Sequence, residues 1–259
     1  MLARIPVLLL GIPAAYGLLV AGGDLVRLLF LAIIGLLGQL ELTRMLERGE
    51  QRKPVPEWLA GIAIMTCTHL CGERGLLLSS ALAVTLLMVF TVLRGLRGDG
   101  CRRFCNMLFS TFYLPFCLSF FLMLARNNGG MTLFVLIASI WALDIGAYAF
   151  GMSIRGPRLA PMISPNKTIS GALGGAVSCI AFLLLAGHYK FLELPTLNLI
   201  GMALSVAVLG QTADLFESIL KRESEVKDSG ALLGAHGGIL DRIDSILFLG
   251  PVCYTFFIL

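Results

Sequence analysis

Five of the acidic residues that stand within or beside the hydrophobic runs of this chain gather in three segments of its C-terminal half. They are Asp144 in WALDIGAYAFG, Asp214 and Glu217 in QTADLFES, and Asp241 and Asp244 in GGILDRIDS. A charged side chain in the middle of a membrane helix costs about 2.5–3.5 kcal/mol on insertion scales, so such residues usually serve a function. The members of each pair are three positions apart, which places both carboxylates on one helix face. Mg²⁺ relieves the repulsion between such acids and binds through a few carboxylates plus substrate phosphates. We therefore predict a metal site at the two pairs, Asp214 with Glu217 and Asp241 with Asp244, and Asp144 nearby.

A second interpretation of these acids needs no metal. Asp241 and Asp244 could cap the N-terminus of a helix, where negative charge is favourable. Asp144 could pair with a structural arginine. Capping explains one acid at a helix start well, whereas two acids on one face, close to two more on another helix, favour the cation.

Two segments combine basic residues, hydroxyls and glycines, at 164–175 (SPNKTISGALGG) and 221–238 (KRESEVKDSGALLGAHGG). In the first, Ser164, Lys167 and Thr168 precede a glycine-rich helix start, where free N–H groups can bind an anion. The glycines could instead allow close helix packing, and the charges of the second segment could simply be solvated. Basic, phosphate-binding segments that face acids able to hold Mg²⁺ are typical of phosphoryl or nucleotidyl transfer, and we expect that reaction at the membrane surface. The second segment contributes Lys221, Arg222, Lys227 and His236.

The composition is that of a polytopic membrane protein. Of the 259 residues, 57% are hydrophobic and 14% are charged, whereas soluble domains carry about 25% charged residues. Backbone groups in lipid must pair internally, and because the apolar runs do not alternate, we predict helices rather than a closed barrel. With no basic tail or nucleic-acid motif, we expect no nucleic-acid partner. The seven cysteines lie mostly in apolar runs, so we expect free thiols rather than a disulfide framework.

The predicted fold is an all-α bundle of about nine membrane spans that forms a single integral membrane domain, residues 1–259. Residues 1–130 are expected to be scaffold and packing spans, and residues 131–259 to carry the catalytic spans and loops. The first run could be mistaken for a signal peptide, but a second span follows at once, so we interpret it as a retained helix. The expected spans are 5–21, 25–43, 57–71, 75–93, 106–125, 131–150, 171–187, 195–217 and 239–258.

The basic residues are distributed unevenly between the two sides of this bundle. Sixteen of the 20 lie in the N-terminal segment or in the loops after the second, fourth, sixth and eighth spans. By the positive-inside rule that side is cytoplasmic, so we expect the N-terminus inside and the C-terminus outside. The two long loops, 152–170 and 218–238, then face the cytoplasm. The opposite side holds Arg27, Arg74, Arg126 and Lys190.

The segment from Ser218 to Asp244 resembles the signature of the phosphatidate cytidylyltransferases, also called CDP-diacylglycerol synthases. That signature contains Ser, Lys-Arg, Lys-Asp, His-Gly-Gly and Asp-Arg-x-Asp at fixed spacing. DIGAYAFG and SPNKT resemble two further elements of the family, so the resemblance covers residues 140 to 250. It departs at Ser170, where members often have Glu, and at Gly234, where a proline is common. The matching positions are Ser218, Lys221, Arg222, Lys227, Asp228, His236, Gly237, Gly238, Asp241, Arg242 and Asp244.

The resemblance implies that CTP and phosphatidate react to give CDP-diacylglycerol and diphosphate, in the phospholipid biosynthesis of a prokaryotic cytoplasmic membrane. It implies Mg²⁺ as the cofactor, leaves a second metal ion open, and suggests a homodimer. In this interpretation Asp214, Asp241, Asp244, Lys227 and His236 are catalytic. The phosphates of CTP or lipid are bound by Ser164, Lys167, Thr168, Lys221, Arg222, Arg242, Gly237 and Gly238.

Two other functions stay open at this point. The acceptor could be a polyprenol or another lipid alcohol, or an archaeol-type phospholipid, because the spans that contact acyl chains carry no recognisable motif. The chain could also be a secondary transporter for a phosphorylated solute. Transporters place their acids near the midplane on broken helices, whereas the polar groups here gather toward one face, which favours the enzyme.

Overall fold

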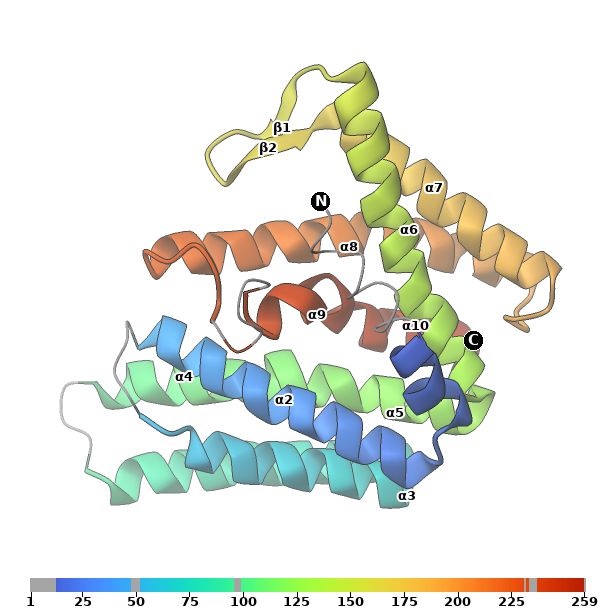
Figure 1. Ribbon diagram of the computed structural model, residues 1–259. Helices are drawn as coiled ribbons and strands as arrows, with labels where there is room; N and C mark the ends of the chain where they lie inside the picture. Colours follow the sequence, from blue (N-terminus) through green and yellow to red (C-terminus); the bar gives the residue numbers. More distant parts are fainter. Residues whose placement is uncertain (1–12, 48–51, 96–98, 231, 233–236, 259) are drawn as a thin grey trace.

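The computed structural model describes residues 13–47, 52–95, 99–230, 232 and 237–258, and helices make up nearly all of it (Figure 1). Six of them are long and apolar enough to cross a membrane. The predicted class, an all-α polytopic membrane protein, is therefore confirmed, while the count of nine spans and the sides of the termini stay predictions. The elements are η2 (Gly17–Ala21), α2 (Asp24–Leu46), α3 (Val55–Leu93), α4 (Gly100–Thr111), η3 (Phe112–Phe116), α5 (Cys117–Asn128), α6 (Gly130–Ile154), β1 (Arg158–Ala160), β2 (Ser164–Thr168), α7 (Ile169–His188), α8 (Thr196–Glu223), α9 (Leu240–Leu247) and α10 (Leu249–Ile258).

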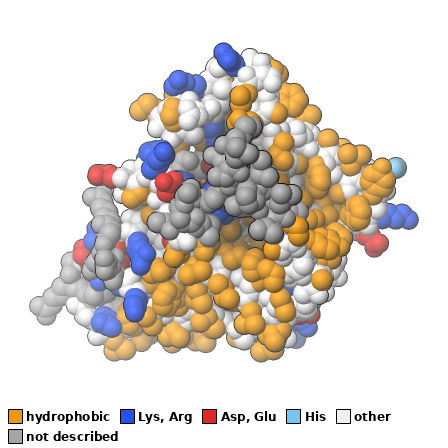
Figure 2. All heavy atoms as spheres, viewed as in Figure 1, with side chains coloured by type: hydrophobic (Ala, Val, Ile, Leu, Met, Phe, Trp, Pro, Cys, Tyr) orange, Lys and Arg blue, Asp and Glu red, His pale blue; other side chains and the backbone are white. Residues whose placement is uncertain are grey.

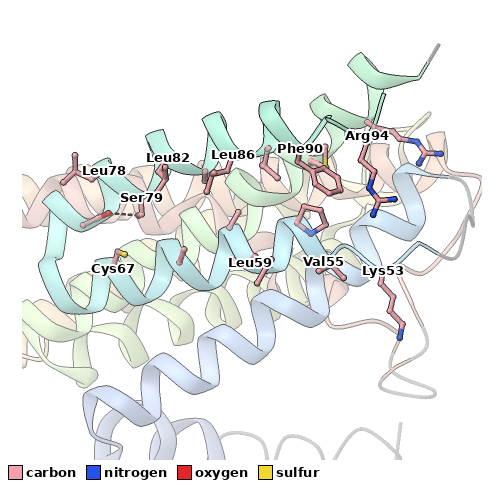
Figure 3. A pocket seen from close by; sticks show the side chains of 18 of the residues that line it. Lys53, Val55, Leu59, Cys67, Leu78, Ser79, Leu82, Leu86, Phe90 and Arg94 are labelled. Carbon is pink, nitrogen blue, oxygen red and sulfur yellow. Dashed lines mark hydrogen bonds between the residues drawn. The ribbon is translucent and has the colours of Figure 1, made fainter. Parts of the chain in front are cut away.

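α3 is a helical hairpin. Its 39 residues contain both spans expected at 57–71 and 75–93, and its two halves lie side by side (Figure 3). The chain reverses at Gly72, whose φ of 61° lies in the left-handed region that glycine adopts without steric cost. A Cβ at Gly75 would collide with the carbonyl of Cys67. The glycines thus allow a tight turn between two antiparallel helices.

The segment 100–128 is the central element of the bundle. In the most apolar stretch of this segment 72% of the residues are buried. The corresponding share is 28–39% in the other five candidate spans. It joins α4 and α5 through the π-helical turn η3, which contains Pro115. Because proline has no N–H to donate, a local widening of the helix is a common way to accommodate it. Tyr113 in this turn meets Phe216 of α8 and Phe248, with ring centroids 5.4 to 6.0 Å apart. The first half of the chain is thereby packed against the helices that carry the signature.

The segment expected as the last span, 239–258, consists of two short helices. α9 has eight residues and α10 has ten, so neither is among the six candidate spans. Pro251 accounts for the break, because it cannot donate to the carbonyl of Leu247 four residues earlier. The charged residues of this segment therefore lie on their own helix, α9.

The loop expected at 152–170 contains a two-stranded antiparallel sheet that the sequence did not predict. β1 and β2 pair with Arg158 opposite Thr168 and Ala160 opposite Ser164, with a register irregularity between these pairs. β2 runs directly into α7, so the pairing fixes the direction in which the chain enters that helix. Figure 1 shows the hairpin projecting beyond the ends of α6 and α7.

Candidate active site

A cleft of about 390 Å³ opens where α6, β2, α7 and α8 meet. Its polar lining includes Asp144 from α6, Lys167 and Thr168 from β2, and Asp214 from α8. Four of the residues predicted to act in the site therefore come together from three separate segments. The cleft is the part of the predicted site that is open to a ligand.

The lysine of the SPNKT motif and the first acid of α8 form an ion pair across the cleft. Lys167 donates to Asp214, and the two side chains are 29% and 32% exposed. Thr168 caps α7, since its hydroxyl accepts a hydrogen bond from the N–H of Gly171 at 3.1 Å. The loop therefore presents its lysine from a fixed position at a helix start.

Two glycines set the separation of α6 and α7 beside this cleft. A Cβ on Gly171 would lie 2.7 Å from the carbonyl oxygen of Ala147, and one on Gly175 would lie 2.7 Å from that of Leu143. The glycine-rich start of α7 thus provides close helix packing, one of the two roles expected for it. The other role, binding an anion, stays a prediction.

A second polar cluster joins the end of α8 to the start of α9. Lys221 donates to Glu217 at 2.6 Å and to Asp241 at 2.8 Å, and its side chain is only 14% exposed. Predicted as a phosphate ligand, this lysine connects two acids from different helices in the structure. The spacing of four between Glu217 and Lys221 lets both lie on one face of α8.

Asp241 has hydrogen-bond partners for both of its carboxylate oxygens. Oδ1 accepts from Lys221, and Oδ2 accepts from the N–H and hydroxyl of Ser229, each at 3.0 Å, and from the N–H of Gly238 at 2.8 Å. Gly237 has a φ of 80°, and a Cβ there would lie 2.8 Å from the same Oδ2. Asp241 therefore fixes the loop that precedes α9, which resembles the capping role considered for this acid.

Sequence reasoning missed Glu41 of α2 in this cluster. Its carboxylate accepts from the hydroxyl of Ser229 at 3.1 Å and from the N–H groups of Ile239 at 3.1 Å and Leu240 at 2.9 Å. With 1% of its surface exposed, it holds the start of α9 from within the expected scaffold. An acid inside an apolar run was the available signal, but nothing in the sequence points from position 41 to position 239.

Two further acids are buried deeper. Asp244 accepts from the N–H of Ser245 at 2.6 Å, and Glu217 is fully buried, with Oε1 lacking a partner within the described part of the chain. Asp244 lies close enough to Asp214 and Asp144 for their charges to interact. The charges of three predicted metal ligands, Asp144, Asp214 and Asp244, thus act on one another, whereas Asp241 is turned to the loop.

The remaining predicted residues surround these clusters. Arg222, Lys227 and Arg242 are exposed, and Ser164 is half-buried at the start of β2. His236 lies outside the described residues. Figure 2 shows that lysines and arginines gather on the left of the molecule, where the second cluster and the ends of α2 and α4 lie, while apolar side chains cover much of the rest. Ligands with negative charge would meet the molecule on this side.

Among residues 13–47, 52–95, 99–230, 232 and 237–258, no group of three or more His, Cys, Asp or Glu side chains is arranged to hold a metal ion. All seven cysteines are free thiols, as expected from the sequence.

The fold and the site define a helical membrane protein with a cleft lined by acids and a lysine. The chain belongs to the cytidylyltransferase family, whose profile matches residues 2–259. It is 41% identical over 144 residues to the phosphatidate cytidylyltransferase of Bacillus subtilis, covering 55% of this chain and 54% of that protein. It is 38% identical over 153 residues to that of Thermotoga maritima, with 56% of each chain covered. It is 42% identical over 132 residues to that of Brucella suis, covering 49% of this chain and 47% of that protein. The chain thus spans about half the length of the curated relatives it matches.

Proposed function

We propose that this protein is a phosphatidate cytidylyltransferase. The observation that carries the proposal is the set of relatives of that name, which reach 41% identity over 144 residues. In the proposed reaction an oxygen of the phosphatidate phosphate attacks the α-phosphorus of CTP. The bond from that phosphorus to the bridging oxygen breaks, and diphosphate leaves with the bonding electrons. A lipid phosphate is largely ionised at neutral pH, because its second pKa is about 6, so the attack needs no strong base.

Charge neutralisation and positioning supply the catalysis in this proposal, since two polyanions must meet. Lys167 stands at the mouth of the cleft, where it pairs with Asp214. A phosphate that enters the cleft can take the lysine's hydrogen bonds and leave the carboxylate for another cation. The exposed Arg222, Lys227 and Arg242 add positive charge nearby. Lys221 keeps Asp241 and the loop before α9 in place, and Gly237 and Gly238 belong to that loop. The catalytic role expected of His236 stays a prediction.

The acids of the cleft fit Mg²⁺. This ion usually keeps waters and binds one or two carboxylates together with substrate phosphates, rather than a complete protein cage. Asp144 and Asp214 both line the cleft, and Asp244 is their neighbour. We propose that Asp144 and Asp214, which line the cleft, hold the ion, with Asp244 and Asp241 as supporting residues. When bound, the ion would offset the negative charge that develops on the phosphate oxygens.

The test uses purified protein in detergent with Mg²⁺, an acceptor lipid and CTP labelled on either the α- or the γ-phosphate. Transfer of the α-label to lipid with phosphatidate as acceptor is the expected result. A γ-labelled lipid formed from a polyprenol or diacylglycerol would replace the proposal with a lipid kinase. Folded protein that labels no lipid with any acceptor would contradict an enzymatic function altogether.

The proposed topology has nine spans, with the N-terminus and the cleft on the cytoplasmic side, where CTP is found. The uneven distribution of basic residues supports it. A reporter fused after Leu259 should then respond from the outer side of the membrane. Reporter activity in the cytoplasm would contradict the nine-span topology without affecting the proposed reaction.

A further inference from the structure

A long apolar groove runs between the two halves of the α3 hairpin, far along the chain from the cleft. It has a volume of about 1050 Å³ and is lined on both sides by α3, with contributions from Arg103 and Met107 of α4. Leu78, Leu82 and Leu86 line it while being 57–73% exposed. Figure 3 shows these leucines along one half of the hairpin, facing the half that carries Val55 and Leu59. An apolar channel of this length, open along its side, has the form required by an acyl chain.

The groove is apolar along its length and basic at one end. Arg52, Lys53, Arg94 and Arg103 line that end, beside the ends of the hairpin. Figure 3 shows Arg94 at the end of one half and Lys53 before the start of the other, with the Lys53 side chain directed away from Arg94. At the opposite end, near the turn at Gly72, Arg74 is the single basic residue of the lining. The basic end belongs to the loops that hold most of the positive charge of the chain.

Two of the basic residues at this end, Lys53 and Arg94, have no acidic partner among the described residues. Arg52 forms ion pairs with Glu57 at 2.5 Å and with Glu47 at 2.9 Å, and both acid side chains are at most 4% exposed. Burial opposes the charge of the Arg52 guanidinium, but hydrogen bonds to Glu57 and Glu47 outweigh it and raise its pKa. By contrast, within the described part of the chain neither Lys53 nor Arg94 has an ion-pair partner. Arg94 instead stacks on Phe90, 5.3 Å from the ring centroid.

We propose that the groove binds one anionic glycerophospholipid of the surrounding membrane. An acyl chain lies between the two halves of α3. The phosphate is held at the basic end by Arg94 and by Lys53, whose exposed, flexible side chain turns toward it. Charge complementarity selects this occupant. A zwitterionic lipid brings its own cation together with its phosphate, and an apolar helix of another protein chain brings no negative charge, so an anionic lipid gains most from two basic residues beside a hydrophobic surface. The groove and the cleft share none of their described lining residues, so the site is separate from the proposed reaction and does not depend on it.

The test is native mass spectrometry of the purified, full-length protein, titrated in detergent with dioleoylphosphatidylglycerol or dioleoylphosphatidylcholine. The wild type should bind one phosphatidylglycerol tightly and phosphatidylcholine weakly. Lys53→Gln and Arg94→Gln should each weaken the first phosphatidylglycerol about fivefold, the effect of one basic residue near an anionic lipid headgroup. The double variant should bind the first phosphatidylglycerol about 25-fold more weakly than the wild type, because two independent effects multiply. Ala63→Phe, which fills the groove without touching its charges, should abolish the tight adduct.

Two arginine variants serve as controls. Arg102→Gln removes an exposed arginine in the first turn of α4, which pairs with Asp99 and does not line the groove. Arg74→Gln removes the cation at the opposite end. Both should bind phosphatidylglycerol like the wild type.

Three outcomes would overturn the proposal. The first is unchanged affinity in the Lys53→Gln/Arg94→Gln variant, and the second is equal affinity of the wild type for phosphatidylcholine. The third is a dimer that dissociates in Ala63→Phe while lipid binding stays the same, because the groove would then be occupied by a second copy of the chain. The same spectra report oligomeric state and bound lipid, so these outcomes are separated in one measurement.

Discussion

Glu41 in α2 accepts a hydrogen bond from the hydroxyl of Ser229 at 3.1 Å, although 188 positions separate the two residues. The same hydroxyl oxygen lies 3.0 Å from Oδ2 of Asp241, so its single proton is shared between two carboxylates. Because Glu41 is buried, water cannot replace these hydrogen bonds, and the N-terminal helices become part of what positions α9. An expected scaffold span therefore contributes to the geometry of the signature.

Replacing Glu41 by Gln should weaken the start of α9. The Gln side chain keeps one oxygen that can accept a hydrogen bond, but its NH₂ group replaces the other. At least one of the N–H groups that donate to Glu41 therefore loses its acceptor. We expect a loss of about 2 kcal/mol in stability, the usual cost of leaving a buried donor unpaired. In the proposed reaction, transfer should fall mainly in kcat, because none of the hydrogen-bond partners of Glu41 lines the cleft. Thermal unfolding in detergent and steady-state kinetics measure the two effects.

Glu73→Gln is the matched control for this variant. Glu73 accepts a hydrogen bond from Tyr254 at 2.8 Å, at the turn of the α3 hairpin and away from the cleft. The Glu73→Gln variant should have a lower unfolding temperature and an unchanged kcat. If Glu41→Gln likewise changed only stability, Glu41 would be a structural residue and not a positioning one.

Lys221 should behave as the shared partner of two acids. Lys221→Met leaves Glu217 and Asp241 facing each other without a cation, and removing one partner of a buried ion pair typically costs about 3–5 kcal/mol. Replacing Glu217 by Gln in the same protein removes one of the unpaired charges. The Lys221→Met/Glu217→Gln variant should therefore be more stable than Lys221→Met alone, by about 1–3 kcal/mol. Chemical or thermal unfolding of the wild type, both single variants and the double variant completes the cycle; strictly additive effects would mean that the pair does not interact.

Asp214 should affect metal dependence as well as rate. Asp214→Asn keeps the size of the side chain but removes the charge that faces Lys167 and, in the proposed site, Mg²⁺. We expect transfer to fall by about 10²-fold or more, as for other electrostatic groups of an active site, and half-maximal activity to require more Mg²⁺. Rates measured across a Mg²⁺ titration test both points. Glu193→Gln, an exposed acid in the loop between α7 and α8, serves as the control, and an unaltered Mg²⁺ dependence in Asp214→Asn would remove this residue from the metal site.

The sequence predicted those elements that depend on hydropathy and local spacing. The span expected at 25–43 corresponds to α2 (Asp24–Leu46), and that at 131–150 to α6 (Gly130–Ile154). The turn at Gly72 followed from a short polar interruption between two apolar runs. Run length and glycine content are local properties, so a single sequence reveals them.

The elements that escaped prediction depend on contacts between distant segments. Pro251 divides the last expected span into α9 and α10. Because a proline is tolerated near the start of a helix, its presence alone did not predict this division. The hydrogen bonds of Glu41 join position 41 to positions 239 and 240, and no pattern along the chain marks that meeting. Likewise, the signature marked Asp241 as an acid of the site but not that Lys221, Ser229 and Gly238 occupy its oxygens. Motif spacing identifies the participants, and packing decides what each one contacts.

The close approach of α6 and α7 should set the shape of the cleft. Gly175→Ala places a Cβ 2.7 Å from the carbonyl oxygen of Leu143, the residue before Asp144. Because this neighbour is backbone and cannot rotate away, α6 must shift, and overpacking of this kind costs about 1–3 kcal/mol. We expect lower thermal stability together with a higher KM for CTP, since the shift moves one wall of the cleft. Gly17→Ala, where a Cβ meets nothing within 4 Å, should leave both quantities unchanged. A Gly175→Ala protein with wild-type stability and KM would show that the helices adjust without moving Asp144, and that the glycines of α7 do not determine the cleft.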